Sequence, residues 1–140
     1  MKKLGMICVA LFLIDAGASR SAHSHLQGGS VDQRKYGAVT LIRVINTAEM
    51  EYRASKKHFA DYVELRDSGA LDTAGKRFGN AWSALPFDRK AVSEPLPGYE
   101  MHFTVDGTGK SYSVSLGDKS NYDSFFTDER GLIYEAKPIQ

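Results

Sequence analysis

One long helical pattern constrains this chain more than any other feature. Between residues 31 and 59 the apolar side chains recur at steps of three and four, the spacing of one face of an α-helix. The pattern predicts a helix of roughly 43 Å at 1.5 Å per residue, against which the rest of a 140-residue chain must pack. Ser30 and Gln33 form an S-x-x-Q capping box at its start. The expected buried series is Tyr36, Ala38, Leu41, Ile42, Ile45, Ala48, Tyr52 and Phe59.

Polar side chains fill the remaining surface of this helix. Its last turn, with Lys56, Lys57 and His58, places cations at a helix C-terminus, where the helix dipole favours them. We therefore expect the helix to end near residue 59, with its polar residues facing solvent. These solvent-facing residues are Arg34, Arg43, Asn46, Glu49, Arg53 and Lys57.

The middle of the chain is predicted to hold one short helix and a long irregular segment. Asp61 and Glu64 form a second capping box, and the helix it opens can be closed by Gly69 in a left-handed conformation. Residues 70–97 contain scattered glycines and prolines and are expected to be irregular. The large apolar residues there, Phe78, Trp82, Leu85 and Phe87, are expected to pin the segment to the core rather than line a ligand site.

From Gly98 onward the apolar period changes to two, which indicates strands. Two alternating runs flank the glycine-containing turn 106–109, and residues 124–127 and 132–135 flank a second turn at 128–131. The predicted fold class is α+β: one long N-terminal helix packed on a four-stranded antiparallel sheet, within a domain of residues 30–140.

The first residues have the pattern of a signal peptide. A basic start, Lys2-Lys3, precedes an apolar run over residues 4–14 that is too short to span a bilayer as a helix. Small residues at 16–18 predict cleavage after Ala18, with Ala22 as an alternative. Residues 1–18 are thus a predicted signal peptide and 19–29 a flexible leader. The mature protein is expected to be periplasmic or extracellular, with no stable membrane span.

Cleavage would also alter the chemistry of the chain. The only cysteine, Cys8, would be lost, so the mature domain would have neither a disulfide nor a thiolate. Losing two lysines and one aspartate from a chain of net charge +1 leaves a net charge of zero. This balance gives no basic footprint for nucleic acid. His23 and His25 form an H-x-H pair in the leader, where we expect solvated side chains rather than a metal site.

Three patterns resemble parts of functional sites, and none predicts one by itself. Residues 107–111 (GTGKS) end like a phosphate-binding loop, but Thr104 stands where its first glycine is required. His58 and His102 have no recognisable serine–acid arrangement beside them in sequence. The loop from Asp118 to Asp123 has oxygen ligands that calcium accepts, and it is also an ordinary turn composition. We therefore assign no catalytic, cofactor or metal residue, and leave the calcium reading of this loop open.

Two phrases of the sequence resemble type IV pilin-like globular domains. The first is residues 41–49 (LIRVINTAE) followed by Tyr52, and the second is residues 124–133 (SFFTDERGLI), with residues 98–105 similar to the strand between. The resemblance covers about residues 38–135 and implies a long helix on an antiparallel sheet. It departs at the N-terminus, where a pilin has a glutamate at the fifth mature position. Here processing after Gly5 would put Ala10 at that position.

The resemblance implies an exported, non-catalytic structural or protein-interaction subunit, accessory to a pilus or secretion system. Its partners would be extracytoplasmic proteins. The alternative is a small secreted enzyme or ligand-binding protein that uses the 70–97 segment.

Overall fold

The computed structural model describes residues 31–139. The predicted signal peptide and leader, with Cys8, His23 and His25, lie outside the described residues, as does Ser30 of the first capping box. No helix within residues 31–139 is long and apolar enough to cross a membrane.

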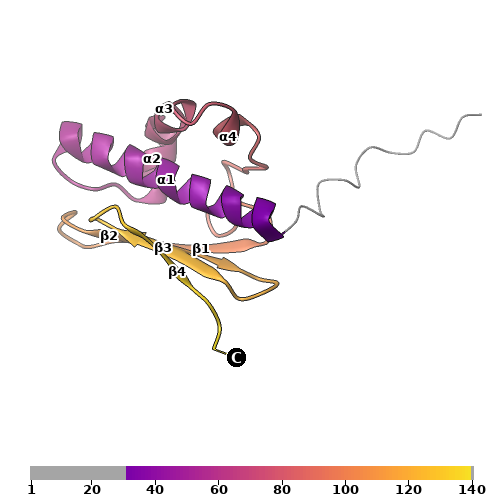
Figure 1. Ribbon diagram of the computed structural model, residues 1–140. Helices are drawn as coiled ribbons and strands as arrows, with labels where there is room; N and C mark the ends of the chain where they lie inside the picture. The colour runs from indigo at the N-terminus through magenta and orange to yellow at the C-terminus, as the bar shows by residue number, and fades with distance from the viewer. Residues whose placement is uncertain (1–30, 140) are drawn as a thin grey trace, which may run out of the picture.

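The fold is α+β, as predicted. Helix α1 (Val31–Lys56) lies over one face of an antiparallel sheet, and the short helices pack on its other side (Figure 1). The sheet has the order β1-β2-β3-β4, so each strand pairs with its neighbour in sequence. The short helices are α2 (Tyr62–Asp67), α3 (Ala70–Lys76) and α4 (Asn80–Ser83), and the strands are β1 (Tyr99–Val105), β2 (Tyr112–Asp118), β3 (Ser124–Asp128) and β4 (Ile133–Ala136).

The position of α1 between two layers explains which of its residues are buried. Leu41, Ile42 and Ile45 are fully buried, as the periodicity predicts, and so is Val44, which the predicted series did not include. A helix packed on two sides buries a wider arc than a single apolar stripe. Tyr36 was predicted to be buried, but it is 59% exposed, because it lies on the side of α1 that neither layer covers.

Helix α1 ends at Lys56, three residues before the predicted end. Lys57 has a left-handed backbone, with φ at 73°. The next backbone donors then leave the helical pattern: the N–H of Phe59 donates to the Gly109 carbonyl at 2.8 Å, and the N–H of Ala60 donates to Glu49 Oε2 at 3.1 Å. Partners from the β1–β2 turn and from the helix side chain thus take the bonds that would have continued the helix.

The segment 70–97 is more regular than predicted. Its first part forms α3 and α4, so the prediction of an irregular 70–97 was wrong for residues 70–76 and 80–83. Gly69, left-handed as predicted with φ at 75°, ends α2 and directly precedes α3. Gly75 lies against the indole of Trp82, and a Cβ there would come within 2.3 Å of Trp82 Cε2. Trp82 is buried and the other three large apolar residues pack against the core, as predicted.

Candidate interaction surface

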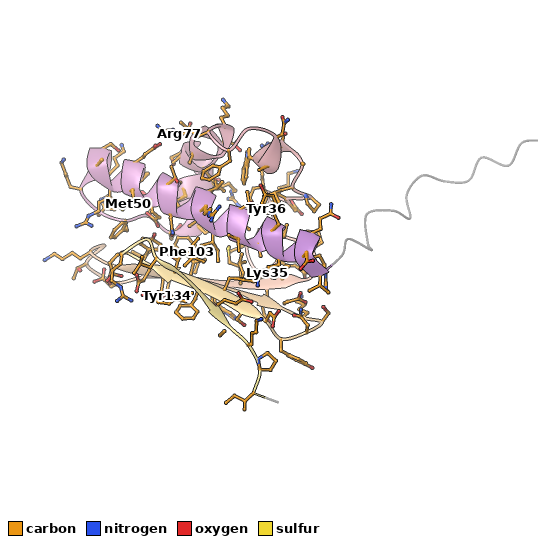
Figure 2. The ribbon with its side chains drawn as sticks, in the orientation of Figure 1. Lys35, Tyr36, Met50, Arg77, Phe103 and Tyr134 are labelled. Atoms are coloured by element: carbon orange, nitrogen blue, oxygen red, sulfur yellow. The ribbon has the colours of Figure 1, made fainter. Side chains whose placement is uncertain are left out.

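The sheet has one face covered by α1 and one face left open. The burial pattern of β2 places Tyr112, Val114 and Leu116 on the covered face of the sheet. The residues that alternate with them, Ser113, Ser115 and Gly117, therefore lie on the opposite face. We call this other side the outer face. Tyr134 of β4 lies on it, on the side of the sheet away from α1 (Figure 2). No helix or strand among residues 31–139 covers the outer face in the ribbon (Figure 1).

One row of side chains crosses all four strands of the outer face. The strand register pairs His102 with Ser115, Ser115 with Phe126, and Phe126 with Tyr134. We call these four residues the cross-strand row. The rings of Phe126 and Tyr134 stack with centroids 4.9 Å apart and planes at 14°, and Phe126 remains 41% exposed. The row thus has a ring pair on β3 and β4, a small hydroxyl side chain on β2 and a histidine on β1.

A shallow hollow of about 320 Å³ lies beside the ring pair. The hydroxyl groups of Thr104 and Ser113 contact each other at 2.7 Å within it. Asp128, at one end, accepts hydrogen bonds from Arg130, and these lower the pKa of its carboxyl group. The hollow therefore has an aromatic wall and a polar floor. Its lining residues are His102, Thr104, Ser113, Val114, Ser115, Phe126, Thr127 and Asp128.

Asn46 connects α1 to the covered face of the sheet. Its side-chain oxygen accepts hydrogen bonds from Tyr112 Oη at 2.8 Å and Thr127 Oγ1 at 3.1 Å, and its Nδ2 donates to the Gly131 carbonyl at 3.2 Å. The prediction that Asn46 faces solvent was therefore wrong. These bonds hold β2 and the β3–β4 turn in register with the helix, and so help to fix the outer face.

Glu49 is fully buried, although the helical pattern predicted it to face solvent. Its Oε2 accepts the Ala60 N–H, and its Oε1 has no hydrogen-bond partner among the described residues. Burial raises the pKa of Glu49 to about 7; the bond from Ala60 opposes this shift and the charges of Glu64 and Asp61 add to it. Nothing in the residue spacing distinguished Glu49 from the exposed polar residues around it. Its position depends on the 57–61 loop folding back over it.

The two histidines of the domain lie on different segments, one after α1 and one on β1, and both are exposed. His58 follows α1, with its Nε2 3.9 Å from Glu64 Oε1, and its ring packs edge-on against Tyr52. His102 lies on the outer face with its Nε2 3.7 Å from Glu100 Oε1. The sheet places Ser115 beside His102, but within residues 31–139 no hydrogen bond joins the two side chains. The geometry offers no activated serine there.

The 107–111 segment forms the turn between β1 and β2. Asp106 Oδ1 accepts hydrogen bonds from the backbone N–H groups of Lys110 and Ser111, at 2.7 and 3.3 Å. A phosphate-binding loop needs such amides free and a helix after them. In this turn the Asp106 side chain accepts hydrogen bonds from those amides, and strand β2 follows instead of a helix.

The side-chain oxygen atoms of the 118–123 loop accept hydrogen bonds from groups within the loop. Buried Asp118 accepts from the N–H and the hydroxyl of Ser120, and its Oδ1 lies 3.6 Å from Arg34 Nη1. Burial alone would raise the pKa of Asp118, but the Ser120 hydrogen bonds and the Arg34 charge lower it. Asn121 and Asp123 bond each other. Within residues 31–139 no group of three or more His, Cys, Asp and Glu side chains could hold a metal ion. The loop thus acts as an anchor for the N-terminal end of α1.

A second hollow, of about 550 Å³, lies in the 70–97 segment. Trp82 and Phe87 contact each other at one side, with ring centroids 4.9 Å apart. Arg89 pairs with Asp72 at 3.0 Å across the opening, and Lys76 lines it. The hollow combines an aromatic wall with Lys76 and with Arg89, whose charge Asp72 partly balances, and this combination can accept an acidic aromatic molecule.

No protein-family model, curated protein or solved structure matches this chain. The first phrase of the pilin resemblance, residues 41–49, lies in the buried centre of α1. The second, residues 124–133, contains β3, the β3–β4 turn and the start of β4.

Proposed function

We propose that this chain is an exported, non-catalytic, pilin-like subunit that binds other extracytoplasmic proteins through its outer face. The observation that carries the proposal is the open outer face with its cross-strand row of aromatic and small polar side chains. Aromatic side chains with small polar neighbours are typical of protein contact surfaces. The long helix on a four-stranded sheet, together with the two pilin-like phrases, supports the same assignment.

The proposed role is accessory to a pilus or secretion system rather than that of a major filament subunit. Type IV filaments pack long apolar N-terminal helices in a central core. In this chain the apolar run at residues 4–14 would be removed with the signal peptide. The mature domain would then contact its partners through its folded surface.

We expect the protein recovered after export to begin between residues 19 and 23 and to sediment as a monomer or small oligomer. N-terminal sequencing followed by analytical ultracentrifugation at micromolar concentration measures both properties. A start at Met6 would indicate prepilin-peptidase processing. That start, or long polymers formed by the exported protein, would contradict the accessory role.

Ligand binding by the 70–97 segment is the second candidate function, favoured by the hollow beside Trp82. Trp82 is the only tryptophan of the chain, so its fluorescence reports on this hollow directly. If the segment binds an acidic aromatic molecule, 4-hydroxybenzoate should quench Trp82, and Arg89→Gln should weaken the quenching by about tenfold. Benzamide, which lacks the carboxylate, is the control. Equal quenching by both compounds would rule out an anion-selective site.

A further inference from the structure

The stacked ring pair on the outer face leaves one of its aromatic faces unused. The rings of Phe126 and Tyr134 are nearly parallel and their centroids are 4.9 Å apart, too close for two rings lying edge to edge in one plane. The two rings therefore stack face to face across the strands. Their separation matches the spacing of neighbouring strands, about 4.8 Å. One face of Phe126 contacts Tyr134, and the opposite face is therefore directed over β2. The residue beneath that opposite face is Ser115.

The strand register sets the width of the space above Ser115. Phe126 on β3 and His102 on β1 are two strand spacings apart, about 9.6 Å, and only the short side chain of Ser115 stands between them. A flat ring placed midway would lie about 4.8 Å from each, continuing the existing stack. The hollow found beside Phe126 occupies this position. We call the space between Phe126 and His102 the ring slot.

The polar groups around the ring slot select among possible occupants. The hydroxyl groups of Thr104, Ser113 and Ser115 favour a ring with a polar edge, such as tyrosine or tryptophan, over a purely apolar side chain. Asp128 pairs with Arg130, and Lys119 pairs with Glu94. Glu100, two residues from His102 on β1, has its Oε1 3.7 Å from His102 Nε2 and has no lysine or arginine ion pair among residues 31–139, so it contributes an acidic group to the outer face. A basic residue beside the aromatic one would complement this charge.

We propose that the ring slot binds a tyrosine or tryptophan side chain, next to a lysine or arginine, on a partner protein. An open slot encloses a ring on two faces only, so a free small molecule would gain little from it. A protein that also contacts the neighbouring surface would gain much more. The inference rests on the proposed interaction function and names the chemistry of its partner.

The test uses the exported chain and the probe N-acetyl-lysyl-tyrosinamide, with N-acetyl-lysyl-leucinamide as its matched control. In an NMR titration the tyrosine probe should shift the amide signals of Ser115 and Phe126. The leucine probe should bind about tenfold more weakly. Equal binding of the two probes, or shifts that avoid the cross-strand row, would overturn the proposal.

Variants separate the ring slot from the rest of the outer face. Ser115→Tyr fills the slot with the chain's own ring and should abolish binding. Ser115 is half-buried on the outer face, where an aromatic residue beside Phe126 is favourable in a strand, so the fold should persist. Ala136→Tyr adds the same ring to the outer face at the exposed edge strand β4, three strands from Glu100, and should bind like the wild type. Retained binding by Ser115→Tyr would overturn the slot.

A second copy of the chain is the competing occupant, because Tyr122 is 75% exposed. If Tyr122→Ser and Ser115→Tyr each abolish a wild-type dimer in ultracentrifugation, the occupant is Tyr122 of a second copy and the assignment to a partner protein is overturned. If the tyrosine probe does not bind the ring slot, the export and sedimentation experiments still test the proposed function separately. Failure of this inference is therefore distinguishable from failure of the proposed function.

Discussion

Truncating Ile45 to alanine is expected to lower the free energy of unfolding by about 2–5 kcal/mol. Ile45 is fully buried in the middle of α1, within the core that joins the helix to the layers on either side of it. Removing its outer carbons loses their burial and leaves a cavity that the packed layers cannot fully close. Urea unfolding followed by circular dichroism measures the change.

Met50 provides the control on the same helix. It is half-exposed, so Met50→Ala should change the free energy of unfolding by less than about 0.5 kcal/mol. A loss below about 0.5 kcal/mol for Ile45→Ala would mean that α1 does not bury this face.

Replacing Glu49 by glutamine is expected to remove a large part of the pH dependence of stability. The pKa of Glu49 is raised from 4.5 to about 7 in the folded protein by burial. The folded state therefore holds a proton that the unfolded state releases at lower pH. The stabilisation is fully present below about pH 4.5, declines through the interval up to about pH 7 and is absent above it. The decline should amount to about 3 kcal/mol.

The measurement is the difference in unfolding free energy between Glu49→Gln and the wild type at several pH values from 5 to 8. The amide oxygen of glutamine can still accept the Ala60 N–H, so the variant should be close to wild type at pH 5 and more stable than wild type at pH 8. The titratable groups that interact electrostatically with Glu49 are Glu64 of α2, Asp61 at its N-cap, Tyr52 of α1 and Tyr112 of β2.

Glu51→Gln is the matched control, because Glu51 lies on the same helix but pairs with Arg77 at the surface. It should leave the pH profile between 5 and 8 unchanged. An unaltered profile for Glu49→Gln would show that Glu49 is not the group that titrates in this interval.

The main elements of the fold could be predicted from local sequence patterns. The spacing of Leu41, Ile45 and Ala48 is a property of the chain itself, and it indicates a helix whatever the helix packs against. The alternation in residues 99–105 and 112–116 indicates strands in the same way, and the glycines at 107 and 109 mark the turn between them. Helix, hairpins and fold class were therefore correct.

The polar residues of α1 could not be placed in this way. Asn46 and Glu49 occupy positions that a one-sided helix would expose. Because layers pack on both sides of α1, Asn46 is half-buried against the sheet and Glu49 is fully buried. The predicted helix end at residue 59 failed for a related reason. The acceptor for the Phe59 N–H is the Gly109 carbonyl, 50 positions away in the sequence, which no local pattern can reveal.

The sequence by itself determined the order of the elements and the main apolar faces, because these follow from side-chain periodicity over a few neighbouring residues. The tertiary structure alone decided the ring slot and the burial of Glu49. The slot requires His102, Ser115 and Phe126 to meet in one row, which is set by the register of three strands. Glu49 is desolvated only once the 57–61 loop bonds to it and to the β1–β2 turn. Both features depend on contacts between segments distant in sequence, and such contacts exist only in the folded chain.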